Sequence, residues 1–161
     1  MEQPPDLARD LFEHYSSIIN RLSQALPQRF QAKLDEVCRG LPLLFRTDYP
    51  LVLNHDDLLA MNIHVDEETG CITGIVDCAD AKLSPFDMSL GGVEKILGVG
   101  TSSSWLFHPE HEYFWMQVWK AFYGITGYLS DDDKRAIEVG RTLGLFRAYG
   151  FDRRPEKDGW R

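Results

Sequence analysis

The segment His-Asp-Asp-Leu-Leu-Ala-Met-Asn, residues 55–62, together with Asp77 further along, decides the fold of this chain. It reads H-x-D-x-x-x-x-N, followed by an apolar run, a turn, a second apolar run and a carboxylate. In this layout Asp57 can accept the proton of a substrate hydroxyl, while Asn62 and Asp77 can hold a hard cation. Phosphoryl transfer needs placement and charge neutralisation from a protein, so the pattern predicts that chemistry.

The residues around this pattern predict a β-hairpin that carries it. Residues 61–65 and 71–76 are the expected arms, and residues 66–70 form a turn that ends in a glycine suited to positive φ. A short apolar strand at residues 51–53 leads directly into the H-x-D segment. The catalytic loop and hairpin are therefore expected within residues 51–77.

Hydrophobic periodicity predicts that the rest of the chain is mostly helical, which makes the fold class α+β. Helices are expected over residues 7–26, 30–38, 87–97, 110–123 and 130–149. Ser130 is the expected N-cap of the last helix, with acidic residues in its first turn. Gly140 and Gly144 in that helix are expected to permit close packing. The Gly/Ser/Thr-rich residues 98–104 are predicted to be a flexible linker.

The segment from His55 to Asp77 resembles the catalytic region of the aminoglycoside phosphotransferase and choline kinase group, distant relatives of protein kinases. Residues 74–90 and 141–151 resemble, more narrowly, the fungal aminoglycoside phosphotransferase-like proteins. The resemblance implies a mostly helical, protein-kinase-like C-terminal lobe with a small catalytic β-hairpin. It also implies ATP and Mg²⁺ as cofactors.

The resemblance gives individual roles to five residues. It implies Asp57 as the catalytic base, and Asn62 and Asp77 as the magnesium ligands. His55 is expected to brace the loop, as a structural rather than a catalytic residue. Asp87 is expected either to brace the catalytic loop by accepting its backbone N–H groups or to cap the helix that follows, and both alternatives stay open.

The sequence also departs from the family pattern. Asp56 stands where relatives often have glycine, so it is expected to be a solvated neighbour that adds negative potential. Cys78 stands where relatives often have tryptophan or another large aromatic residue, and Gly91 stands where the fungal relatives often have tryptophan. Both changes are expected to shrink the surroundings of Asp77. The aromatic residues 113–123 are expected to pack in the core, although a pocket lining or an exposed patch are alternatives.

The 161 residues contain neither G-x-G-x-x-G nor G-x-x-x-x-G-K-[ST], and no lysine lies in an apolar strand pattern ahead of residue 55. The family's small N-terminal lobe carries such a phosphate loop and lysine. We therefore expect residues 1–151 to be a C-terminal lobe whose N-terminal nucleotide lobe is missing, and residues 152–161 to be a charged tail.

Composition narrows the possible partners. The formal net charge of −8 argues against nucleic acid and suits a cationic substrate, although acidity for the sake of solubility is the favoured explanation. Cys38, Cys71 and Cys78 lack metal spacing and are expected to be reduced core thiols. The polar N-terminus and the absence of a long apolar run predict a cytoplasmic protein without a membrane partner.

Three functions remain open. The first is an ATP-dependent phosphotransferase-type domain for a small-molecule hydroxyl, truncated and of weak or no activity. The second is a non-catalytic module that binds a small molecule, a partner chain or a second copy of itself across the face that an N-terminal lobe would cover. The third is a lobe recruited to a different small-molecule reaction. The acid–amide–acid trio favours the first, and the missing phosphate loop and lysine favour the others.

Overall fold

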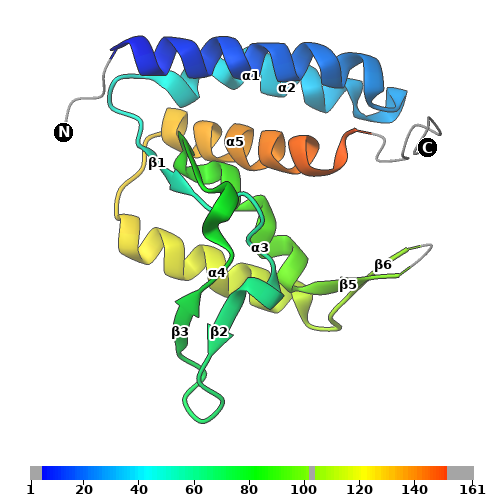
Figure 1. Cartoon of the computed structure of the whole chain (residues 1–161), viewed down its shortest axis with the longest axis vertical. Helices are drawn as coiled ribbons and strands as arrows, with labels where there is room; N and C mark the ends of the chain where they lie inside the picture. The colour runs from blue at the N-terminus through cyan, green and yellow to red at the C-terminus, as the bar shows by residue number, and fades with distance from the viewer. Residues whose placement is uncertain (1–4, 102–103, 152–161) are drawn as a thin grey trace, which may run out of the picture.

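The computed structural model describes residues 5–101 and 104–151. The predicted tail at 152–161 and part of the predicted linker lie outside the described residues. Three helices form one layer of the molecule: α1 (Pro5–Ala25), α2 (Gln31–Gly40) and α5 (Asp131–Tyr149) pack against one another (Figure 1). A further helix, α4 (His111–Thr126), lies on the other side of α5 from α1.

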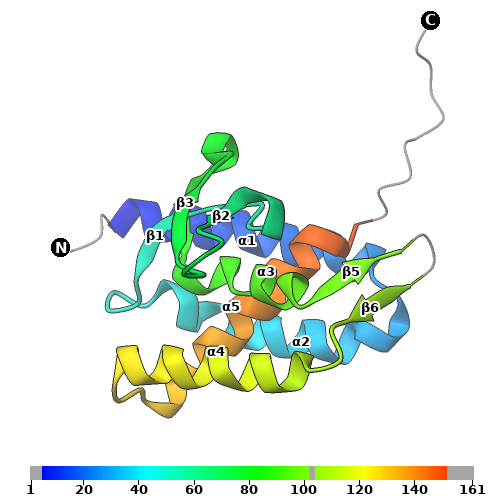
Figure 2. The same cartoon turned by 90° about the horizontal axis from the view of Figure 1, so that it is seen from below.

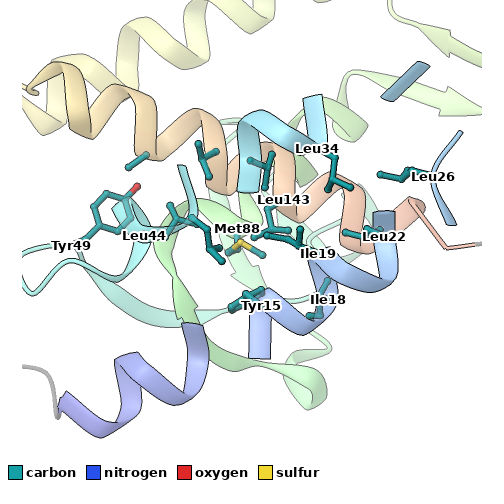
Figure 3. Packing of buried hydrophobic residues seen from close by; sticks show 14 residues of the cluster. Tyr15, Ile18, Ile19, Leu22, Leu26, Leu34, Leu44, Tyr49, Met88 and Leu143 are labelled. Atoms are coloured by element: carbon teal, nitrogen blue, oxygen red, sulfur yellow. The ribbon is translucent and has the colours of Figure 1, made fainter. Parts of the chain in front are cut away.

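The hydrophobic core lies between these three helices. Tyr15, Ile18, Ile19 and Leu22 recur at helical spacing on α1, and all four are buried (Figure 3). They meet apolar residues of α2 and α5, with Leu143 of α5 fully buried. The helix expected over 7–26 is therefore confirmed, and its periodic apolar face is the face that it buries.

Antiparallel strand pairs carry the rest of the described architecture. Strand β1 (Leu51–Asn54) pairs with β4 (Lys82–Pro85), and β2 (Ile63–Val65) pairs with β3 (Ile72–Ile75). The β2–β3 pair is the predicted hairpin, and it projects from the helical body in both views (Figures 1 and 2). Gly70 ends its turn with a φ of 70°. The mostly helical α+β class is therefore confirmed.

Short 3₁₀ helices join these elements: η1 (Gln28–Phe30), η2 (Leu41–Phe45), η3 (Ala60–Asn62), η4 (Cys78–Asp80) and η5 (Phe86–Ser89). The helix expected over 87–97 is divided into η5 and α3 (Gly91–Ile96). The expected start of the hairpin at Met61 belongs to η3, so the strand begins two residues later, at Ile63.

The prediction of a flexible linker at 98–104 is wrong. Strands β5 (Gly98–Gly100) and β6 (Trp105–Phe107) form an antiparallel hairpin that projects from the body (Figure 2). A Cβ at Gly98 would lie 2.3 Å from Nε1 of Trp105. The glycine therefore gives room for an aromatic ring that covers the strand, and its presence does not mark a linker here.

The predicted N-cap of the last helix is confirmed. Ser130 Oγ accepts a hydrogen bond from the Asp133 N–H, and the Asp133 carboxylate accepts one from the Ser130 N–H, which completes a capping box. Hydrogen bonds from Ser130 and from Arg46 lower the pKa of Asp133 to about 2. Helix α5 therefore begins with an ionised, well-satisfied carboxylate.

The two glycines of α5 permit close packing, as the sequence predicts. A Cβ at Gly140 would lie 2.1 Å from the carboxylate of Asp87, and a Cβ at Gly144 would lie 2.2 Å from the carbonyl oxygen of Met88. Because real Cβ atoms do not approach that closely, only glycine lets η5 lie directly on α5.

Two expectations about burial are wrong. Cys38, Cys71 and Cys78 are free thiols, but all three are exposed. None of the residues of α4 is buried, so this aromatic helix is not part of the core. Its rings pack on one another and on Phe86 at the surface, as in the contact between Trp119 and Phe122 at 5.4 Å. Among the described helices, none is long and apolar enough to cross a membrane.

Candidate functional site

His55 connects the two halves of the sequence pattern. The backbone N–H of Asp57 donates to Nδ1 of His55 at 3.2 Å, and Nε2 of the same ring lies 2.8 Å from the carbonyl oxygen of Val76. Since Nδ1 accepts, the ring proton is on Nε2, which donates to Val76. The imidazole therefore holds the segment of Asp57 against the residue that precedes Asp77.

Asn62 makes a second connection between the same segments. Its side chain is buried, with 6% exposure. Its Nδ2 atom donates to the carbonyl oxygen of Asp57 at 2.8 Å, and the backbone carbonyl oxygen of Asn62 accepts from the N–H of Val76 at 3.0 Å. Because the amide nitrogen is committed to Asp57, Oδ1 is the atom of this side chain that is suited to a cation.

Asp77 has an unusual backbone. With φ 61° and ψ 47° it is left-handed, and among the described residues it is the one non-glycine residue with positive φ. That conformation costs roughly 1 kcal/mol for a residue with a Cβ, although aspartate tolerates it better than most. Backbone strain of this kind gathers at functional sites, where it directs a side chain. The turn from β3 into η4 is therefore shaped around this carboxylate.

These contacts bring the segments of Asp57, Asn62 and Asp77 together. Asp57 and Asp77 are exposed, whereas Asn62 is buried. No cluster of three or more His, Cys, Asp or Glu side chains that could hold a metal occurs in the described part of the chain. Asn62 and Asp77 are the two residues of this loop that could hold a cation, and so few protein ligands would suit Mg²⁺, since this ion keeps water and phosphate oxygens as its other ligands.

Asp56 is not the solvated neighbour that the sequence predicts. Its carboxylate is 20% exposed, accepts hydrogen bonds from Arg147 of α5, and lies 2.6 Å from Nζ of Lys82. Burial opposes ionisation of Asp56, but the hydrogen bonds from Arg147 and Lys82 outweigh it and lower its pKa. The Asp56 carboxylate therefore has a structural role, because its ion pairs join the loop to α5 and β4.

Sequence reasoning missed Arg147 and Lys82. Arg147 lies one helical turn after Leu143, on the buried face of α5. A cation at that position needs a buried anion, and this was the available signal. Lys82 is opposite Asn54 in the β1–β4 pair. Its position beside the loop could not be predicted, because no sequence pattern identified β4.

Buried polar groups hold the end of β1 where it enters the loop. Nδ2 of Asn54 donates to Ser84 Oγ and to the carbonyl oxygen of Pro85, each at 2.8 Å. Ser89 Oγ donates to Oδ1 of Asn54 at 2.7 Å, and the carbonyl oxygen of His55 lies 3.1 Å from the same hydroxyl. Every polar atom of the Asn54 amide group thus has a partner, so the start of the loop is fixed from below.

Asp87 is fully buried, and its contacts match neither of the two roles expected for it. One carboxylate oxygen accepts a hydrogen bond from the Tyr49 hydroxyl at 2.7 Å, and the other has no hydrogen-bond partner. The helical segments that follow it have no side-chain cap. Burial raises the pKa of Asp87 to about 7, although the hydrogen bond from Tyr49 acts in the opposite direction.

The two departures near Asp77 have different surroundings. Cys78 is exposed, directly after Asp77. Gly91 is buried against α5, where a Cβ would lie 2.8 Å from Cγ of Leu145. The small residue at 91 therefore serves the packing of α3 on α5.

The H-x-D-x-x-x-x-N pattern and Asp77 thus lie on a loop and a hairpin of a mostly helical α+β body. The family model described as the phosphotransferase enzyme family, APH, matches residues 2–93 of 161, more than half of the chain. The chain belongs to this family. The matched region includes His55, Asp57, Asn62, Asp77 and Asp87. Comparisons with curated proteins and with solved structures found no match.

Proposed function

We propose that this chain is an ATP-dependent phosphotransferase-type domain that acts on a small-molecule hydroxyl, built as a kinase-like C-terminal lobe. The observation that supports it best is the double connection through His55 and Asn62, which brings the segments of Asp57 and Asp77 together. A loop that only joined two strands has no need of a strained aspartate at its far end.

In this proposal Asp57 orients the acceptor hydroxyl and takes its proton as the oxygen attacks the terminal phosphoryl group. Asn62 Oδ1 and the Asp77 carboxylate would hold Mg²⁺, which neutralises phosphate charge when bound. His55 supports both carboxylates through the backbone, since its ring nitrogens contact the Asp57 N–H and the Val76 carbonyl oxygen.

We expect low activity from this chain. Asp57 and Asp77 are exposed, so water screens the charges on which such a site depends. The sequence also offers no glycine-rich loop for the phosphates. We therefore expect ATP to bind with a Kd on the order of millimolar or weaker, which corresponds to only about 4 kcal/mol.

The test is phosphate transfer from radiolabelled ATP to a panel of small alcohols, with and without Mg²⁺. The Asp57→Asn variant keeps the shape of the side chain and removes the proton acceptor. Removal of a positioned base typically costs about 10²- to 10⁴-fold in rate, so the variant should lose any activity that the parent has. Asp80→Asn, at an exposed carboxylate three residues after Asp77, is the matched control and should keep it. Turnover that survives Asp57→Asn would show that this loop is not the active site.

One observation favours the second function, a non-catalytic binding module. Large apolar side chains of α4 and its C-terminal end are exposed, among them Met116 at 61%, Ile125 at 87% and Tyr128 at 94%. An exposed apolar surface of this kind is typical of a region that binds a partner or a second copy. Light scattering at micromolar concentration tests binding to a second copy, because that form of the function requires a dimer or larger species.

A further inference from the structure

A cavity of about 550 Å³ lies between the start of β1, η5, α4 and the first half of α5. This volume falls within the range of small-molecule sites in proteins. Its walls are formed by Asp48, Tyr49, Pro50, Val52, Phe86, Phe122, Thr126, Leu129, Asp133 and Ile137. None of Asp57, Asn62 and Asp77 lines it, so it is a separate space from the proposed phosphotransfer site.

The apolar walls of the cavity are flat. The rings of Phe86 and Phe122 are nearly parallel, with an interplanar angle of 8° and centroids 6.2 Å apart. The ring of Tyr49 lies 5.5 Å from that of Phe86. Ile137 of α5 is buried, whereas Thr126 at the end of α4 is exposed, so the cavity opens beside Thr126. Aromatic side chains arranged in this way favour a planar apolar ligand.

The charge in the wall of the cavity is negative. Asp48 and Asp133 both line it, and Arg46 is the cation paired with them. Nη2 of Arg46 donates a hydrogen bond to the Asp133 carboxylate at 2.5 Å, and the Ser130 hydroxyl donates another to the same carboxylate. The Nε atom of Arg46 lies 3.3 Å from the Asp48 carboxylate but without hydrogen-bond geometry, and the Asp48 side chain is 75% exposed. Two carboxylates against one guanidinium leave one negative charge, located at Asp48.

We propose that this cavity binds a flat aromatic molecule that carries one protonated amine. The ring system contacts Tyr49, Phe86 and Phe122, and the amine pairs with Asp48. The ligand needs no hydroxyl and is not the phosphate acceptor, so this inference goes beyond the proposed function and does not depend on it.

The first test uses the parent chain and three probes that differ only in the group on one naphthalene ring: 1-naphthylmethylamine, 1-naphthylmethanol and 1-naphthoate. Affinity is measured by equilibrium dialysis. An exposed ion pair contributes at most about 1 kcal/mol, so the amine should bind up to about fivefold more tightly than the alcohol. The carboxylate should bind most weakly. Equal affinities, or tightest binding by naphthoate, would overturn the proposal.

The second test fills the cavity. Thr126→Trp places an indole at the opening and should weaken binding of the amine at least tenfold. Ile125→Trp adds the same side chain one residue earlier, at a position that is 87% exposed, and should leave binding unchanged. Asp48→Asn should reduce the amine to the affinity of the alcohol. Binding that is unchanged in Thr126→Trp, or lost equally in Ile125→Trp, would place the ligand elsewhere. Asp57→Asn should bind the amine like the parent, which separates this result from any failure of the phosphotransfer proposal.

Discussion

Replacement of Asp87 by asparagine tests the electrostatics of a carboxyl group that is buried against α5. Burial raises the pKa of Asp87 from 3.8 to about 7 in the folded protein. A tenfold change in the acid dissociation constant corresponds to about 1.4 kcal/mol, so folding favours the protonated carboxyl over the carboxylate by about 4 kcal/mol. The sign follows from linkage: between pH 4 and 7 the folded chain holds a proton that the unfolded chain has released. Stability from this group is therefore present at low pH and is lost as pH rises towards 7.

Asp87→Asn stays neutral at every pH and should remove this dependence. We expect the free energy of unfolding of the variant, relative to that of the parent, to increase by about 3 kcal/mol between pH 5 and pH 8. Urea unfolding followed by circular dichroism, at intervals of half a pH unit, measures it. The difference between the two proteins isolates Asp87 from the other titrating groups.

Asp133→Asn is the matched control for this experiment, because the pKa of Asp133 is lowered to about 2. Its contribution is complete above its unfolded pKa and is lost only as pH falls towards 2. Its difference from the parent should therefore be constant from pH 5 to pH 8. If the Asp87→Asn difference is equally constant, Asp87 ionises freely at neutral pH, and the reasoning from burial is refuted.

Two further predictions concern backbone and packing. Gly140→Ala should destabilise the fold by about 3 kcal/mol, because its Cβ would lie 2.1 Å from the Asp87 carboxylate. The control is Gly124→Ala on α4, whose Cβ would meet no atom within 4 Å and which should stabilise the fold by about 1 kcal/mol. Denaturant unfolding of both variants measures the two effects, and similar effects would contradict the close contact at Gly140. Asp77→Gly should raise the free energy of unfolding by roughly 0.5–1 kcal/mol, since glycine adopts φ 61° without a Cβ penalty. Asp80→Gly should not raise it. A lower melting temperature for Asp77→Gly than for the parent would show that the Asp77 carboxylate stabilises the turn by more than the backbone strain costs.

Local signals in the sequence were sufficient for several elements. The periodic apolar face of α1, the Gly70 turn of the β2–β3 hairpin and the N-cap at Ser130 were all predicted, and each depends on residues close to one another in the sequence. The order of His55, Asp57, Asn62 and Asp77 likewise predicted a compact loop and hairpin. The hydrogen bonds through His55 and Asn62 span that short segment.

Long-range partners could not be read from the sequence. Strand β4 exists because it pairs with β1, and the short run Lys82–Pro85 carries little strand signal of its own. Arg147 reaches Asp56 from a helix at the other end of the chain. The Tyr49 hydroxyl donates to Asp87, and Asp87 is in position to accept only because η5 packs on α5. In each case the contact is determined by the tertiary fold and not by the local sequence pattern.

Composition misled the prediction of burial. Aromatic residues are enriched in cores, but α4 is aromatic around most of its surface, and only part of it contacts Phe86 and α5. The remaining rings of α4 are left outside. The cysteines follow the same logic, because Cys38 lies on the solvent side of α2 and the other two lie beside the projecting hairpin.

The central claim, that Asn62 and Asp77 hold a cation for nucleotide phosphates, is tested most directly by electron paramagnetic resonance of Mn²⁺ in the presence of millimolar ATP. The parent chain should hold Mn²⁺ with ATP at least tenfold more tightly than Asp77→Asn, which tolerates the left-handed backbone but lacks the charge. Asn62→Ala should lose binding similarly, and Asp80→Asn should match the parent. If the Asp77→Asn variant holds Mn²⁺ and ATP as well as the parent does, these residues do not form a metal–nucleotide site.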